Sequence, residues 1–256
     1  MIATAHPLHA TTLARKAVDD GYDVVVAIGG DGTMNEVATA LVGTTATLGL
    51  IPCGSGNGLG RHLGIFGSKS NPWDCLIKGR TRVIDAGEID GRLFFNASGM
   101  GFEALIADKF SRLSKRGFWG YLSTSAYAYR HYAAETYSIR TNSGQVKKSA
   151  FTLAVTNCDQ YGNNAYISPG AKIDDGELDL TSIPPLGLFR SMPLVTQLFT
   201  ARLDRNPSVY RARSSTFEIE RERSGLIHTD GEPWQAGTTV SVKVHPKCLS
   251  ILVPPN

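Results

Sequence analysis

The chain has 256 residues, of which 42% are hydrophobic and 19% charged, a balance typical of globular proteins and long enough for two small domains. Its formal net charge of +3 is too small to indicate nucleic acid as a partner. No run approaches the roughly 18 apolar residues of a membrane helix. The first residues lack the basic-then-apolar pattern of a signal peptide, so we expect a cytoplasmic protein.

The first third of the chain alternates helix and strand patterns. A helical pattern over residues 8–20 ends at Gly21, and two runs of β-formers without polar alternation follow at 24–28 and 48–52. Such runs are typical of strands covered on both faces in a parallel sheet. A helix predicted over 33–42 separates them, so this part of the sequence predicts a Rossmann-like parallel α/β domain.

The start of that second helix carries a capping-box pattern, Thr33-Met34-Asn35-Glu36. In a capping box the Thr33 side chain accepts a hydrogen bond from the third helical amide, and Glu36 reaches back to the amide of the cap residue. We therefore expect Thr33 to cap this helix.

Each predicted strand of this domain runs into a glycine-rich turn, Gly29-Gly30-Asp31-Gly32 or Gly54-Ser55-Gly56-Asn57-Gly58. Backbone amides without Cβ obstruction, at the amino end of a helix, form a ready site for an anion. Turns that follow parallel strands emerge on the same edge of a sheet and can face one crevice. Asp31 could hold a metal-bound phosphate through Mg²⁺ or orient the loop. Neither turn is a Walker A loop or a dinucleotide GxGxxG motif, and each taken alone is also compatible with a plain strand-to-helix turn.

Strand patterns dominate from about residue 82 onwards. Residues 83–89 and 92–97, joined by the two-residue turn Asp90-Gly91, predict an antiparallel hairpin. Further strand-like stretches lie at 137–141, 149–156, 177–183, 216–222, 239–244 and 249–253.

Helical patterns at 103–135 and 186–203 interrupt these strands. We therefore predict a nucleotide-binding α/β domain over residues 1–82 and a mostly antiparallel β-sandwich domain over residues 83–256. The four cysteines and six histidines are widely spaced, without a zinc-type pattern, so we interpret the cysteines as reduced thiols and predict no histidine metal ligand.

The two glycine motifs together resemble the catalytic-domain signature of diacylglycerol and sphingosine kinases. The first motif, Gly29 to Thr33 with Asn35 and Glu36, is also shared with NAD kinases and resembles phosphofructokinase. The second, from Pro52 to Arg61, narrows the resemblance to the lipid kinases. The resemblance continues through residues 95–102, after which Glu103 stands in the acidic position of the family motif. It also includes residues 174–179 and His228-Thr229-Asp230-Gly231-Glu232, so it covers nearly the whole chain.

This resemblance implies an ATP-dependent lipid kinase with a phosphofructokinase- or NAD kinase-like first domain and Mg²⁺ as a cofactor. It implies that Asp230 is the general base for the acceptor hydroxyl, and that Asp174, Asp175 and Glu177 support a structural Mg²⁺ site. From the residues alone, Asp230-Gly231 is interpreted as a β-turn, and the acidic segment that contains Asp174, Asp175 and Glu177 as a solvated loop. The residues implied to bind nucleotide are Gly29, Gly30, Asp31, Gly32, Thr33, Asn35, Glu36, Gly54, Ser55, Gly56, Asn57 and Glu232.

The acceptor implied by the resemblance is a lipid alcohol such as diacylglycerol or a sphingoid base, met at the inner face of a membrane by peripheral contact. Lys109, Arg112 and Arg116 of the predicted long helix could rest on anionic head groups, or could be the solvated face of a covering helix. Formation of a homodimer stays open.

Two other functions stay open at this level. An NAD kinase-like enzyme for a soluble metabolite explains the first glycine motif but not the second. A nucleotide-binding protein without catalysis is the other alternative, because members of the resembled family usually start with a strand and an Asn-Pro-x-Ser-Gly turn that this sequence lacks.

Overall fold

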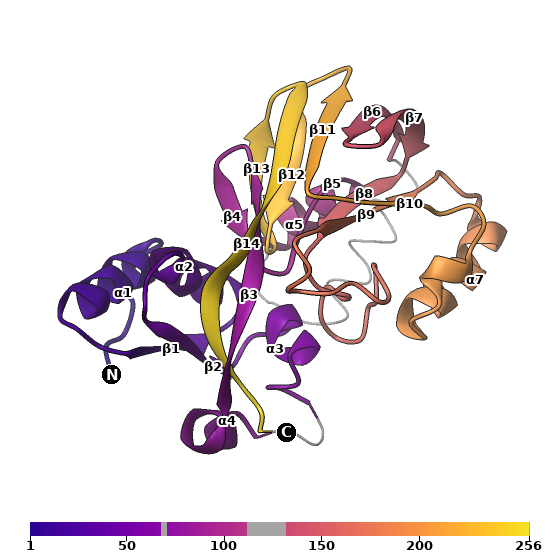
Figure 1. Ribbon diagram of the computed structural model, residues 1–256. Coiled ribbons are helices and arrows are strands. Elements are labelled where there is room, and N and C mark those ends of the chain that lie inside the picture. The colour runs from indigo at the N-terminus through magenta and orange to yellow at the C-terminus, as the bar shows by residue number, and fades with distance from the viewer. Residues whose placement is uncertain (68–70, 112–131, 256) are drawn as a thin grey trace.

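The computed structural model describes residues 1–67, 71–111 and 132–255 (Figure 1). The helices are α1 (His9–Asp19), α2 (Asp31–Leu41), α3 (Gly58–His62), α4 (Pro72–Lys78), α5 (Phe102–Ser111), α7 (Leu188–Phe199) and the short 3₁₀ helix η1 (Leu203–Arg205). The strands are β1 (Val24–Gly29), β2 (Thr47–Pro52), β3 (Arg80–Ile89), β4 (Arg92–Phe94), β5 (Ala97–Gly101), β6 (Glu135–Thr141), β7 (Gly144–Ala150), β8 (Thr152–Thr156), β9 (Leu178–Ile183), β10 (Tyr210–Ser214), β11 (Thr216–Arg221), β12 (Gly225–Thr229), β13 (Glu232–Ala236) and β14 (Thr239–Val253).

These strands form two sheets. The first has the order β1-β2-β14-β11-β6-β7, with β3 paired to β14 and β4 paired to β3. The second has the order β10-β9-β8-β5-β12-β13 and is antiparallel throughout. Apolar side chains from both sheets, among them Phe94, Phe217, Leu153 and Ile227, make one shared core. The predicted fold class is therefore confirmed: a parallel α/β part is followed by a β-sandwich.

The parallel part is built on β1 and β2, which pair from Val24↔Thr47 to Gly29↔Pro52. Helices α1 and α2 lie on the same side of this pair (Figure 1). Strand β1 was expected to be covered on both faces, and this is wrong in the described structure, where Val24, Val26 and Ile28 are 43%, 38% and 45% exposed. The reason is its position as the edge strand, with helices packed on one face only.

The last strand joins the two parts of the molecule. β14 runs beside β3 along much of the fold (Figure 1) and pairs in parallel with β2 at Ser250 and Ile251. Its first half supplies Val240 and Val242 to the sandwich core, and its second half supplies Leu249 and Ile251 to the core of the parallel part. The sequence predicted two separate strands here. A shift in register between His245 and Leu249 explains that break in the pattern.

The predicted domain boundary at residue 82 lies inside β3, and the division of the chain into two domains stays a prediction. The expected hairpin is confirmed, because Asp90 and Gly91 join β3 to β4 with φ values of 44° and 82°. Helices α5 and α7 agree with the start of the predicted helix at 103–135 and with most of the one at 186–203. Residues 112–131, with Arg112 and Arg116, lie outside the described residues.

The predicted capping box at the start of α2 is wrong. The helix begins at Asp31 with Gly30 as its N-cap residue, and no side chain caps it. The Glu36 carboxylate instead accepts hydrogen bonds from the backbone N–H groups of Leu8, at 2.9 Å, and Ala10, at 3.0 Å. A carboxylate at the amino end of α1 interacts favourably with the helix dipole, so Glu36 holds α1 against α2.

Candidate active site

The two glycine turns touch each other backbone to backbone. A Cβ atom placed on Gly54 would stand 2.6 Å from the Cα of Gly30, and one placed on Gly29 would stand 2.7 Å from Oγ1 of Thr33. Contacts this short exclude any side chain. Glycine at position 54 therefore lets the loop after β1 and the loop after β2 form one structure.

The side chain of Asp31 holds this structure together. Its carboxylate accepts hydrogen bonds from the N–H of Asn57, at 3.0 Å, and of Gly58, at 3.1 Å. Asn57, which has a positive φ of 53°, in turn accepts from the N–H of Gly54 and donates to its carbonyl oxygen. Of the two roles predicted for Asp31, orientation of the loops is the one that the contacts show.

The environment of Asp31 changes its proton affinity. Burial raises the pKa of this carboxyl group above its ordinary value, against the opposing effect of the Asn57 and Gly58 amides, and the charge of Asp230 raises it further. The group is therefore a better proton acceptor than a solvated aspartate.

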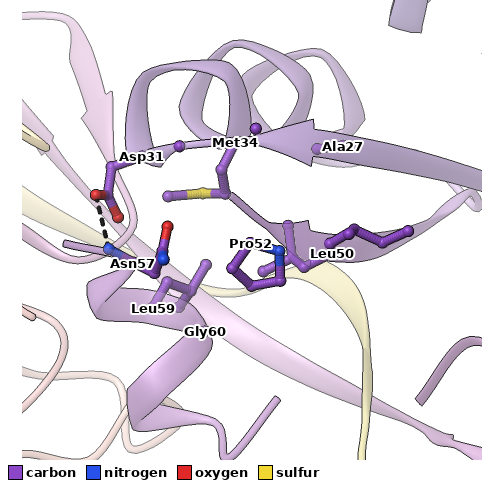
Figure 2. Close-up of a pocket in the computed structure, with 11 residues that line it drawn as sticks. Ala27, Asp31, Met34, Leu50, Pro52, Asn57, Leu59 and Gly60 are labelled. Carbon is purple, nitrogen blue, oxygen red and sulfur yellow. Dashed lines mark hydrogen bonds between the residues drawn. The ribbon is translucent and has the colours of Figure 1, made fainter. Parts of the chain in front are cut away.

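A hollow opens beside this contact (Figure 2). In Figure 2, Asp31 and Asn57 face each other at one end of it, joined by their hydrogen bond. The amino end of α2 adjoins this hollow, and the amino end of a helix favours an anion because its first-turn amides have no partner within the helix. The lining residues are Ala27, Gly29, Gly30, Asp31, Met34, Leu50, Ile51, Pro52, Asn57, Leu59 and Gly60.

Asp230 lies in the tight turn between β12 and β13, with φ values of 47° at Asp230 and 88° at Gly231. Its buried carboxylate accepts four hydrogen bonds, from the backbone N–H groups of Phe95, Asn96 and Ala97 and from Nδ2 of Asn35. The β-turn that the residues alone predict at Asp230-Gly231, without the family resemblance, is therefore present. Burial raises the pKa of Asp230, against the opposing effect of Asn35 and the three amides.

The same turn carries Glu232 to the first glycine loop. A Cβ on Gly32 would stand 3.2 Å from Oε1 of Glu232. Asn35 links the two segments, because its Nδ2 atom donates to Oδ2 of Asp230 at 2.8 Å and to the carbonyl oxygen of Leu93 at 3.0 Å. The structure thus brings Asn35, Asp230 and Glu232 together with the glycine loops.

The predicted magnesium residues lie apart from these contacts and face arginines. Asp174 pairs with Arg82 at 2.7 Å, and Asp175 and Glu177 lie 3.5 and 3.8 Å from Arg213. Within residues 1–67, 71–111 and 132–255, no group of three or more His, Cys, Asp or Glu side chains is arranged to hold a metal ion. A Mg²⁺ site at these three carboxylates stays a prediction.

Sequence reasoning missed one buried carboxylate near this region. Asp85 on β3 is fully buried and accepts from the N–H of Gly176 and of Lys247, both at 2.7 Å. It therefore fixes the acidic segment before β9 to the bulge of β14. A lone aspartate inside a strand pattern gave no signal of this role.

Comparison with known proteins agrees with the resemblance to lipid kinases. The model of the diacylglycerol kinase catalytic domain matches residues 1–89, and that of the YegS C-terminal NAD kinase beta sandwich-like domain matches residues 97–253. A protein of Pseudomonas fluorescens called "Probable lipid kinase YegS-like" is 30% identical over 96% of this chain and 82% of its own length. One of Klebsiella pneumoniae with the same name is 29% identical over 94% of this chain and 81% of its own length.

Solved structures agree at the level of the fold. The crystal structure of a diacylglycerol kinase from Bacillus anthracis superposes with a TM-score of 0.73 at 18% identity, covering 99% of this chain and 84% of that one. An NAD kinase from Archaeoglobus fulgidus in complex with ATP gives a TM-score of 0.50 at 13% identity, covering 97% and 90%. The fold is that of the diacylglycerol kinase and NAD kinase group. Within that group, this chain belongs to the YegS-like family of diacylglycerol kinase-related lipid kinases.

Proposed function

We propose that this protein transfers the γ-phosphoryl group of Mg²⁺-ATP to the hydroxyl group of a lipid alcohol, such as diacylglycerol or a sphingoid base. The observation that carries the proposal is the joining of both glycine loops by Asp31, with Asp230 and Glu232 brought to the same place. Loop amides and the amino end of α2 would hold the phosphates. Phosphoryl transfer depends chiefly on such positioning and on neutralised charge, which Mg²⁺ bound to ATP also supplies.

Two carboxylates are candidates for the base. Asp230 is the one that the family resemblance implies, and its raised pKa suits a proton acceptor. An ionised carboxylate has about four acceptor positions, and four donors already bind Asp230. Asp31 binds two loop amides, so it has capacity left for a substrate hydroxyl. The resemblance favours Asp230 as the base and the remaining acceptor capacity favours Asp31, so we propose Asp230 and test Asp31 beside it.

The test is a transfer assay with labelled ATP, Mg²⁺ and mixed micelles of diacylglycerol, sphingoid base or ceramide, with NAD offered in a parallel reaction. Label in one extracted lipid supports the proposal and names the acceptor. Label in NAD alone selects the soluble-metabolite kinase, and bound ATP without any transfer selects the non-catalytic protein. If Asp230→Asn loses transfer but still binds ATP, while Asp31→Asn keeps transfer, Asp230 is supported as the base. The opposite result for the two variants supports Asp31.

Peripheral contact with the inner face of a membrane is part of this proposal. None of the described helices is long and apolar enough to cross a bilayer. Helix α7 exposes Met192, Val195 and Phe199, which are 65%, 48% and 54% accessible, and apolar side chains of this kind can enter a lipid interface. Weaker sedimentation of Phe199→Ser than of Trp73→Ser with anionic phospholipid vesicles would support this contact, and equal sedimentation would contradict it.

A further inference from the structure

A cluster of three polar side chains lies near the proposed site, formed by Glu103 on α5, His228 on β12 and Tyr161 in the loop after β8. The Tyr161 hydroxyl donates to Oε2 of Glu103, and Nε2 of His228 lies 3.7 Å from the same oxygen. His228 pairs with Gly99, whose neighbour Met100 points into the core between the two sheets. Because side chains alternate along a strand, the cluster lies on the outer face of the second sheet.

The second oxygen of Glu103 is left without a donor. Oε1 is buried and has no hydrogen-bond partner among the residues that the structure describes. It lies against Gly99, where any Cβ atom would collide with the carboxylate, so the glycine leaves the space that Glu103 occupies. A buried carboxylate oxygen without a donor is unfavourable, and a ligand that brings a donor would relieve that cost.

His228 is held so that it faces this carboxylate. The N–H of Gly231 donates to Nδ1 of His228 at 3.3 Å, which leaves the ring proton on Nε2, the atom nearest to Glu103. Gly231 belongs to the turn that carries Asp230 and Glu232. One side of the cluster is therefore fixed by the same turn that reaches the glycine loops.

Tyr161 connects the other side to the phosphate site and to an apolar region. A Cβ on Gly58 would stand 2.8 Å from the carbonyl oxygen of Tyr161, so this residue lies against the second glycine loop. Its ring packs against an apolar cluster of Ala154, Ile167, Leu194 and Leu203 beneath α7. The Glu103 carboxylate thus lies between the second glycine loop and the buried apolar cluster beneath α7.

We propose that Glu103 binds a hydrogen-bond donor of the lipid acceptor, a hydroxyl or an ammonium group. This inference rests on the proposed function and adds a specificity-determining residue to it. An ionised carboxylate only accepts hydrogen bonds, so it selects a lipid with a free hydroxyl or ammonium over one whose polar atom is methylated. Tyr161 and His228 hold the carboxylate in place.

The test compares wild type with Glu103→Gln and Tyr161→Phe. The matched control is Glu88→Gln, since Glu88 also lies beside a histidine, with Oε2 2.7 Å from Nε2 of His245, but on the first sheet. Equilibrium binding is measured with short-chain diacylglycerol, its O-methyl ether and a short-chain sphingoid base, each in the presence of a non-hydrolysable ATP analogue. Turnover of each free lipid is measured in parallel.

We expect Glu103→Gln to weaken binding of the free lipid about tenfold or more, as for a lost hydrogen bond to a charged group, and to bind the methyl ether as wild type does. Tyr161→Phe should weaken lipid binding less, and ATP affinity should stay unchanged in all variants. A larger effect on the sphingoid base than on diacylglycerol assigns the ammonium, and the converse assigns the hydroxyl.

Wild-type lipid affinity in both Glu103→Gln and Tyr161→Phe would overturn the inference while leaving lipid turnover, and with it the proposed function, intact. If Glu103→Gln fails to fold, unchanged lipid affinity in Tyr161→Phe alone overturns it. A wild-type protein that binds none of these lipids overturns both the inference and the proposed function. Selective loss of lipid binding supports the inference even if no lipid is turned over.

Discussion

Nδ2 of Asn35 on α2 donates a 2.8 Å hydrogen bond to Oδ2 of Asp230, a residue 195 positions later in the chain. This bond ties the parallel part of the fold to the sandwich at the point where the glycine loops meet. Because the acceptor is a buried carboxylate, the bond belongs to the stronger class of hydrogen bonds. Stability and alignment of the site should both depend on it.

Substitution of Asn35 by Ala should lower the free energy of unfolding by about 1.5–3 kcal/mol, the usual contribution of a hydrogen bond to a charged group. Urea unfolding followed by fluorescence measures it. Gln235→Ala, at an exposed position on β13, should change it by no more than about 0.5 kcal/mol. Equal effects of the two substitutions would mean that the Asn35–Asp230 bond adds no stability.

Asp230→Asn should also destabilise the fold. Asparagine offers one acceptor oxygen where the carboxylate offers two, so its amide group would face N–H donors of the segment between β4 and β5. Leaving two buried donors unpaired should lower the free energy of unfolding by at least about 2 kcal/mol. Stability equal to wild type would show that this amide–carboxylate contact does not form in solution.

Gly54→Ala should separate the two glycine loops, because its Cβ would stand 2.6 Å from a backbone atom of Gly30. We expect ATP affinity, measured by calorimetric titration, to fall by about tenfold or more, a loss of roughly 1.4 kcal/mol. Gly187→Ala is the control, since no atom lies within 4 Å of a Cβ at that position. Unchanged ATP affinity in Gly54→Ala would place the nucleotide elsewhere.

The raised pKa of Asp31 predicts a pH dependence with a definite sign. A carboxyl group whose pKa is higher in the folded state than in the unfolded state binds more protons when folded, so its contribution to stability falls as pH rises through the folded pKa. Wild type should therefore gain stability relative to Asp31→Asn as pH is lowered from neutrality to about 4, near the ordinary pKa of an aspartate. Urea unfolding of both proteins across this range measures the difference.

Glu88 should give a pH dependence of stability with the opposite sign in the same protein. Burial raises the pKa of Glu88, but hydrogen bonds from His245 and Lys243 outweigh it, and the net shift is downward. Its contribution is present above its unfolded pKa and is lost as pH falls, so wild type should lose stability relative to Glu88→Gln on acidification. If the stability of wild type relative to each variant changes with pH in the same direction for both, the environment of Asp31 differs from the one described.

Local sequence patterns predicted the parts of this structure that depend on neighbouring residues. Glycine runs after β-formers predicted both loops, and Asp90-Gly91 predicted a hairpin. Strand β7 was missed over most of its length, because an edge strand carrying Lys147 and Lys148 has little apolar alternation. Polar strands at sheet edges leave only a weak pattern in the sequence.

Contacts between distant segments could not be read from local pattern. Glu36 matched a capping box, yet α1 packs beside α2, and the Glu36 carboxylate accepts hydrogen bonds from the amides of Leu8 and Ala10 instead. Pairing of β14 with β2 joins Ser250 to Thr47, which no local pattern encodes. The family resemblance singled out Asp230, but only the folded structure shows that four donors surround its carboxylate.

The most direct test of the central claim is the fate of the γ-phosphate. The protein is incubated with Mg²⁺ and a lipid in mixed micelles, once with ATP labelled at the γ-phosphate and once with ATP labelled at the α-phosphate, and the lipid phase is extracted. We predict label in the lipid from γ-labelled ATP only, and less of it with Gly54→Ala. Label from α-labelled ATP, or no lipid label under conditions where ATP is bound, would contradict the assignment of this protein as a lipid kinase.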